Sequence, residues 1–129
     1  MKKIIVALSF FIPLHIYAFP EVLDAQYIQK SQSLMSKSKE ANKIMYDLIS
    51  VEENHPLNED EKKQFVKAVC DGVRFNLEFV KFLATDINQA RIIFKDDQLN
   101  EKTLLEGVKE NIEYKIAQQF IGTKNECKS

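Results

Sequence analysis

The sequence predicts an all-α fold, a small three- to four-helix bundle tied by one disulfide. Through most of the chain, apolar residues recur at spacings of three, four and seven, which is the pattern of amphipathic helices. The 129 residues include only three glycines and three prolines, and no Asn-Gly turn interrupts the pattern. Two Leu-Asn-Glu segments mark points where helices begin.

Residues 1–18 have the order of a secretory signal peptide. Two lysines precede an apolar run that ends near Tyr17, and the small Ala18 offers a cleavage point. The run is shorter than the roughly 20 apolar residues of a membrane span, although an uncleaved anchor is the alternative. The Met-Lys-Lys start and the abundance of Lys, Ile, Asn and Phe suggest a bacterial origin. We therefore expect a cleaved leader and one helical domain, residues 19–129, that is periplasmic or secreted.

The first helix of the mature chain is expected to run from Pro20 to about Glu53. Proline is tolerated in the first turn, because its missing N–H would be unpaired there anyway. Serines 31 and 38 fall on the apolar side of this helix, so its apolar seam is thin in the middle. The seam itself repeats every seven residues, at Tyr27, Leu34, Ala41 and Leu48.

A second helix is expected to start after Pro56. Asn58 can cap it, and Glu61, three residues later, completes a capping box. The helix is apolar on nearly all sides, which indicates either a central position or a face covered by something else. Asp86 followed by Gln89 is a further cap signal, so the helix either breaks there or continues.

A third helix is expected from Asn100 to the region of Gly122. Asn100 is the predicted cap, and Leu99 can pack against Leu104 one turn inside. Gly122 is well placed to end the helix. The predicted apolar stripe consists of Leu104, Leu105, Val108, Ile112, Ile116, Phe120 and Ile121.

The mature chain has two cysteines, Cys70 and Cys127. An oxidising compartment favours their pairing, and the bridge would close a loop that the chain-entropy model values at roughly 4 kcal/mol. A reactive thiol or an intermolecular bridge is the alternative. Neither cysteine has the Cys-x-x-Cys spacing or the neighbouring histidine that activates a thiol, so we predict a structural disulfide.

Charge and motif content argue against several classes of function. Without Lys2 and Lys3 the chain carries 16 basic and 19 acidic residues, a formal charge of −3, which argues against nucleic acid and against anionic membranes as partners. The one histidine of the mature chain, His55, lies beside Pro56 in a predicted loop, where a metal site or a catalytic base is not expected. We therefore predict no enzyme activity, no cofactor and no metal.

Two features are candidates for contact with a partner. The acidic residues at helix starts compensate the helix dipole, but they could also meet a basic partner. Arg74, inside the apolar helix, belongs to a residue type favoured at interfaces. These partner-binding candidates are Glu59, Asp60, Glu61, Asp96, Asp97 and Arg74. The second feature is a ridge of phenylalanines on the same helix, either core or an apolar interface, at Phe75, Phe79 and Phe82.

These observations predict a small exported helical protein that binds another protein, for example as an inhibitor or an immunity-type protein. The likeness to periplasmic immunity proteins lies in the architecture alone, because no motif carries it. The alternative is a carrier or holdase chaperone that accommodates apolar ligands or unfolded chains on the phenylalanine ridge. Homodimerisation remains open, as does the identity of the partner.

Overall fold

The computed structural model describes residues 24–128, which contain helices and no strand. The all-α prediction is confirmed, but the described residues form five helices instead of three or four. The predicted signal peptide, residues 1–18, lies outside the described residues. The helices are α3 (Ala25–Glu52), α4 (Glu59–Ala84), α5 (Ile87–Phe94), α6 (Glu101–Lys109) and α7 (Ile112–Gln119).

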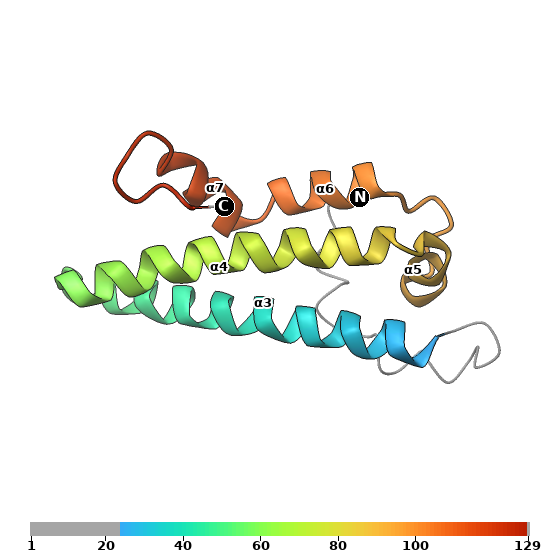
Figure 1. Cartoon of the computed structure of the whole chain (residues 1–129). Coiled ribbons are helices and arrows are strands. Elements are labelled where there is room, and N and C mark those ends of the chain that lie inside the picture. Colours follow the sequence, from blue (N-terminus) through green and yellow to red (C-terminus); the bar gives the residue numbers. More distant parts are fainter. Residues whose placement is uncertain (1–23, 129) are drawn as a thin grey trace.

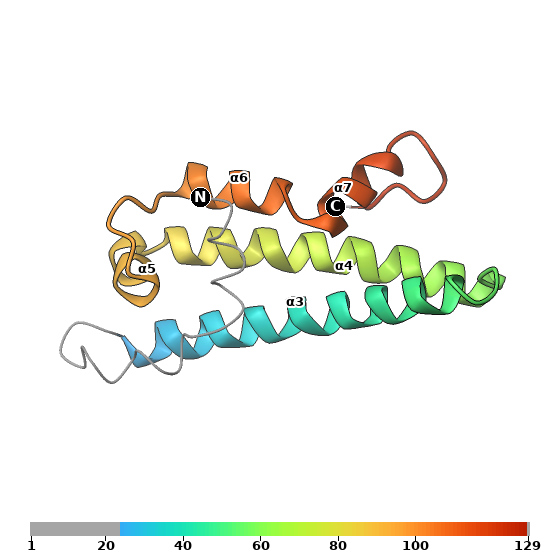
Figure 2. The same cartoon turned by 180° about the vertical axis from the view of Figure 1, so that it is seen from behind.

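Helix α4 is the centre of the molecule. It runs antiparallel to α3 on one side, and α6 and α7 lie along its other side (Figures 1 and 2). The short α5 crosses the end of the bundle where α4 finishes, and it reverses the chain into α6. This central position explains why α4 is apolar on nearly all sides, since helices cover it from two directions.

Of the two long helices, α4 starts at its predicted cap and α3 starts later than predicted. Asn58 and Glu61 form the expected capping box of α4, with Asn58 Oδ1 accepting from Glu61 N at 2.8 Å and Glu61 Oε1 from Asn58 N at 2.9 Å. Helix α3 begins at Ala25 instead of Pro20, because the Asp24 side chain accepts from Gln26 N and caps it there.

Two breaks account for the extra helices. At Asp86, whose carboxylate accepts from the Gln89 backbone N–H, α4 gives way to α5, which settles the alternative that the sequence left open. The helix predicted from Asn100 to Gly122 is wrong as one piece, because the extended backbone of Asn111 separates α6 from α7. The break changes the register of the apolar stripe, so that Ile112 is 39% exposed and Glu113 is buried in its place.

Two clusters of buried side chains form the core. The larger lies among α3, α4, α5 and α6, and all four predicted seam positions of α3 are buried. The smaller is formed by Met45, Ala68, Val69 and Ala117, with further side chains of α4, α7 and the C-terminal tail packed against it.

The predicted disulfide is present. Cys70 of α4 and Cys127 of the tail are bridged with their Cα atoms 5.4 Å apart, which ties the chain end to the central helix. Among the helices of residues 24–128, none combines the length and the apolar character that crossing a membrane requires.

Candidate functional site

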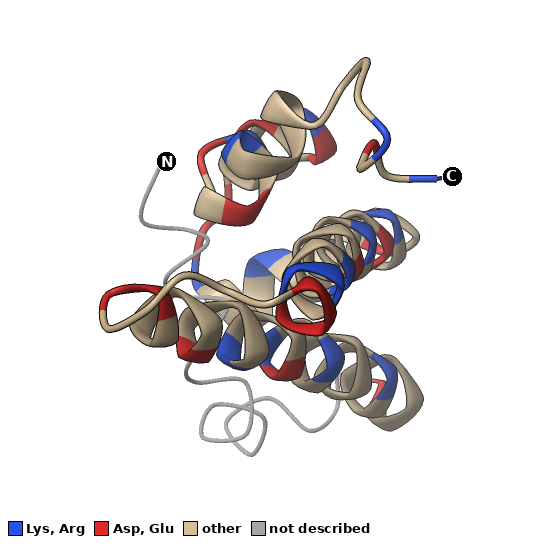
Figure 3. Ribbon diagram, turned by 90° about the vertical axis from the view of Figure 1, so that its left-hand side faces the viewer, with Lys and Arg blue, Asp and Glu red and all other residues tan. Residues whose placement is uncertain are grey.

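The acidic candidates lie at opposite ends of the molecule. Glu59, Asp60 and Glu61 form the first turn of α4, and Figure 3 shows this acidic start from the end where α3 passes into α4. Asp96 and Asp97 lie between α5 and α6, beyond the other end of α4. A helix of 26 residues is about 39 Å long, so the two groups do not share a surface.

Several of these carboxylates already interact with neighbouring residues of the chain. Glu61 belongs to the capping box, and Glu59 forms an exposed ion pair with Lys62 at 3.3 Å. Asp96 Oδ1 accepts from the Gln98 backbone N–H at 3.0 Å. Asp96 and Asp97 also line a shallow hollow, open to solvent, together with Arg91, Ile92 and Lys95.

The three phenylalanines of the ridge occupy different environments. Phe79 is 4% exposed and belongs to the larger core cluster. Phe82 is partly buried, and its ring lies 4.8 Å from the ring of Tyr27, centroid to centroid. Phe75 is partly exposed and packs against neither of the two core clusters. The three rings therefore follow a helical spacing in the sequence, but they divide between the core and the surface of the folded protein.

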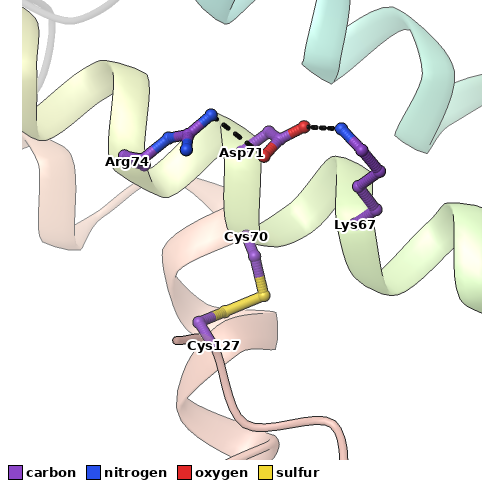
Figure 4. A network of polar contacts seen from close by, with 5 residues as sticks. All are labelled: Lys67, Cys70, Asp71, Arg74 and Cys127. Atoms are coloured by element: carbon purple, nitrogen blue, oxygen red, sulfur yellow. Dashed lines mark hydrogen bonds and ion pairs between the residues drawn. A yellow bond between two sulfur atoms is a disulfide. The ribbon is translucent and has the colours of Figure 1, made fainter. Parts of the chain in front are cut away.

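Phe75 lies beneath two cations. The Arg74 guanidinium is 4.7 Å from the centre of the ring, and the Lys37 ammonium, contributed by α3, is 5.8 Å from it. Asp71, one turn earlier on α4, accepts from Arg74 at 3.3 Å and from Lys67 at 2.5 Å. We call these five residues the Phe75 site; three of them are shown in Figure 4, where the Asp71 side chain and the disulfide leave α4 on different sides.

The contacts of the Phe75 site orient its side chains more than they stabilise the fold. A cation–π contact at an exposed position contributes about 0.5–1 kcal/mol. Ion pairs one turn apart on a helix surface contribute a few tenths of a kcal/mol. The Arg74 side chain is 57% exposed and yet is held by two neighbours. An arginine that is already oriented loses less conformational entropy when it binds a partner.

A buried polar layer lies between the two core clusters, and one of its residues, Ser38, carries a signal in the sequence. Ser38 of α3 donates to Asn76 Oδ1 of α4 at 2.6 Å, and Asn76 Nδ2 donates to Glu113 Oε1 of α7 at 2.5 Å. Ser38 is 7% exposed and Glu113 is 2% exposed. The serine in the thin seam of α3 was a visible signal, whereas nothing in the sequence marked Glu113 as buried.

This polar layer fixes how three helices meet. Gly72 faces the layer: a methyl group built on it would lie 3.4 Å from Glu113 Cγ and 3.7 Å from Asn42 Oδ1. That Asn42 oxygen is buried without a hydrogen-bond partner among the described residues. A buried polar group is costly unless it is paired, so the Ser38–Asn76–Glu113 chain favours one register of α7 on α4.

The side chains that could act as nucleophiles, general bases or metal ligands do not come together in one site of residues 24–128. Both cysteines form the disulfide, so neither is a free thiol. His55 is exposed in the α3–α4 turn, and its Nδ1 lies 2.9 Å from the carbonyl oxygen of Pro56. Residues 24–128 contain no cluster of three or more His, Cys, Asp or Glu side chains that could hold a metal ion. Phe75 is the partly exposed ring of the ridge, and charged side chains of α3 and α4 lie over it.

No protein-family model matches the chain, and neither a curated protein nor a solved structure matches it.

Proposed function

We propose that this chain is a small exported helical protein that binds another protein through the face formed by α3 and α4. The observation that carries the proposal is Phe75, an aromatic ring that lies outside both core clusters and beneath Arg74 and Lys37. Aromatic and arginine side chains are the residue types that most often dominate binding energy at protein interfaces. An inhibitor or immunity-type protein is one form that this role takes.

Two observations support action outside the cytoplasm. The first 18 residues have the charge, apolar run and small residue of a leader peptide. The Cys70–Cys127 disulfide is the kind of bond that persists in oxidising compartments.

The placement of the ridge favours protein binding over the carrier alternative. A carrier for apolar ligands would need the phenylalanines to line an accessible surface. Phe79 instead fills the core and Phe82 packs on Tyr27, which leaves a single ring with charged neighbours at the surface. A small apolar spot inside a charged rim resembles a protein contact more than a lipid or fatty-acid site.

The proposal is tested by capture of a partner in the native host. The full chain, tagged at its C-terminus, is expressed in that host and recovered from the envelope and the culture fluid. We expect one protein to be captured in stoichiometric amount by the unaltered chain, and at least about tenfold less of it by Phe75→Ala. Tyr46→Ala is the matched control, because Tyr46 is a 50% exposed aromatic residue of α3 outside the Phe75 site.

Three results would contradict the proposal. Equal capture by Phe75→Ala and the unaltered chain would remove the Phe75 site from the interface. Recovery of no specific protein would contradict the binding role, and a chain found only in the cytoplasm would contradict export. Binding of a hydrophobic dye by the folded protein would favour the carrier instead. Thermal unfolding of each variant separates loss of binding from loss of fold.

A further inference from the structure

The stretches of α3 and α4 that carry the Phe75 site differ in charge from the chain as a whole. The antiparallel stretches that flank the Phe75 site, residues 30–44 and 67–82, contain seven Lys or Arg and three Asp or Glu, a formal charge of +4. Residues 19–129 together carry −3. Acidic residues gather instead at the two ends of α4. The two stretches of chain that carry the Phe75 site are thus basic within an acidic sequence.

The two cations on the Phe75 ring have little compensation. Lys37 forms no ion pair with any residue in the described part of the chain. Arg74 uses one of its nitrogens on Asp71, in a contact of 3.3 Å. Because Asp71 is shared with Lys67, one carboxylate serves two cations. Guanidinium N–H groups of Arg74 are therefore free to bind a further acceptor.

We infer, on the basis of the proposed function, that the partner is a protein whose contact segment places a carboxylate between Lys37 and Arg74 and an apolar side chain on Phe75. The carboxylate matches the charge of the two cations on the ring and the fork of N–H donors on Arg74. The apolar side chain covers the exposed part of the ring, as an Asp or Glu next to an aromatic or aliphatic residue would do. A bare phosphate or a nucleic acid backbone supplies the charge without that apolar group.

The probe for this inference is a displayed library of random peptides, panned against the full chain with its disulfide intact. We expect the enriched peptides to combine Asp or Glu with an adjacent aromatic or large aliphatic residue. Synthetic copies should bind at least about tenfold more weakly to Lys37→Glu and to Arg74→Glu, and more weakly in 500 mM than in 50 mM salt, because salt screens exposed charges. Lys102→Glu, the same change at an exposed position on α6, is the control.

A charge exchange strengthens the test. Changing the acidic residue of the peptide to lysine should abolish binding to the unaltered chain and restore at least part of the binding to Arg74→Glu. Restored binding also shows that the variant is folded, so the test does not depend on a negative result alone.

The outcomes separate this inference from the proposed function. If a host partner is captured and lost in Phe75→Ala but is insensitive to Lys37→Glu and Arg74→Glu, protein binding stands and the acidic contact is wrong. Enrichment of basic peptides, or of none, overturns the inference. Equal binding of an oligonucleotide or an anionic vesicle, with the same dependence on Arg74, would reveal a general anion surface and would also overturn it.

Discussion

At the scale of the residue, Tyr27 shows how one buried polar group joins α3 to the end of α4. Its hydroxyl donates to the Leu83 carbonyl at 2.9 Å, and its ring packs on Phe82. Burial raises the pKa of the Tyr27 phenol well above its ordinary value of 10.0, and the negative charge of Asp86 raises it further. Above about pH 10.0 the folded protein therefore keeps the phenol proton of Tyr27, whereas the unfolded chain releases it.

This shift predicts a loss of stability in alkali. A raised pKa in the folded state contributes stability below the unfolded value of 10.0, and this contribution falls as pH rises beyond that value. We expect Tyr27→Phe to lower the free energy of unfolding near neutral pH by about 1 kcal/mol or less, because Leu83 O also accepts from Asp86 N. The variant should then lose less stability than the unaltered chain between about pH 9.5 and 11.

Urea unfolding across this pH range measures both effects. Tyr46→Phe is the control, since it removes a phenol hydroxyl from an exposed position of the same helix. Parallel profiles for Tyr27→Phe and the unaltered chain would show that Tyr27 does not cause the alkaline loss.

At the scale of the element, the helix starts differ in how well they are capped. The side chains of Asn58 and Asn100 each accept from a backbone N–H three residues on, while Asn111, at the start of α7, makes no side-chain cap hydrogen bond. Helices α4 and α6 are thus specified locally. The start of α7 depends on the burial of Glu113 and Ala117 against the rest of the molecule.

The caps give a matched set of substitutions. We expect Asn58→Ala and Asn100→Ala each to lower the free energy of unfolding by about 1 kcal/mol, because each leaves a backbone N–H without its acceptor. Asn111→Ala should cost at most a few tenths of a kcal/mol, since no such hydrogen bond is lost. Chemical denaturation of the three variants measures the differences. Equal losses at all three positions would refute local capping as the cause.

At the scale of the whole molecule, the disulfide holds α7 and the tail over the smaller core cluster. Ile116, Phe120 and Cys127 pack against that cluster, and the polar layer separates it from the larger one. The bridge spans 57 residues of sequence. It therefore restricts the unfolded chain substantially, while the larger cluster is assembled without it.

Removal of the bridge should weaken the two halves unequally. We expect Cys70→Ser with Cys127→Ser to lower the free energy of unfolding by about 2–4 kcal/mol. Limited proteolysis should then cleave the tail after Phe120 before it cleaves α3 or α4, since the tail loses its tether. Mass spectrometry of the first fragments checks the order, and an unchanged cleavage pattern would contradict a clamping role for the disulfide.

The sequence by itself determined what depends on neighbouring residues. The capping box at Asn58 and Glu61 and the cap at Asn100 are local hydrogen-bond patterns, so their positions could be predicted. The seven-residue seam of α3 was predictable because helical geometry alone places those residues on one side. The disulfide could be predicted because the sequence offers only one pair of cysteines.

The tertiary structure alone decided which faces meet. Because the helix breaks at Asn111, Glu113 is buried and Ile112 is exposed. The buried Glu113 carboxylate is stabilised by a hydrogen bond from Asn76, which lies on another helix. The same holds for the candidate site: Arg74 and Phe75 were visible in the sequence, but Lys37 joins them only when α3 packs along α4. Periodicity indicates that a face is apolar, whereas its burial depends on partners far away in sequence, and this is why the ridge of Phe75, Phe79 and Phe82 divides between core and surface.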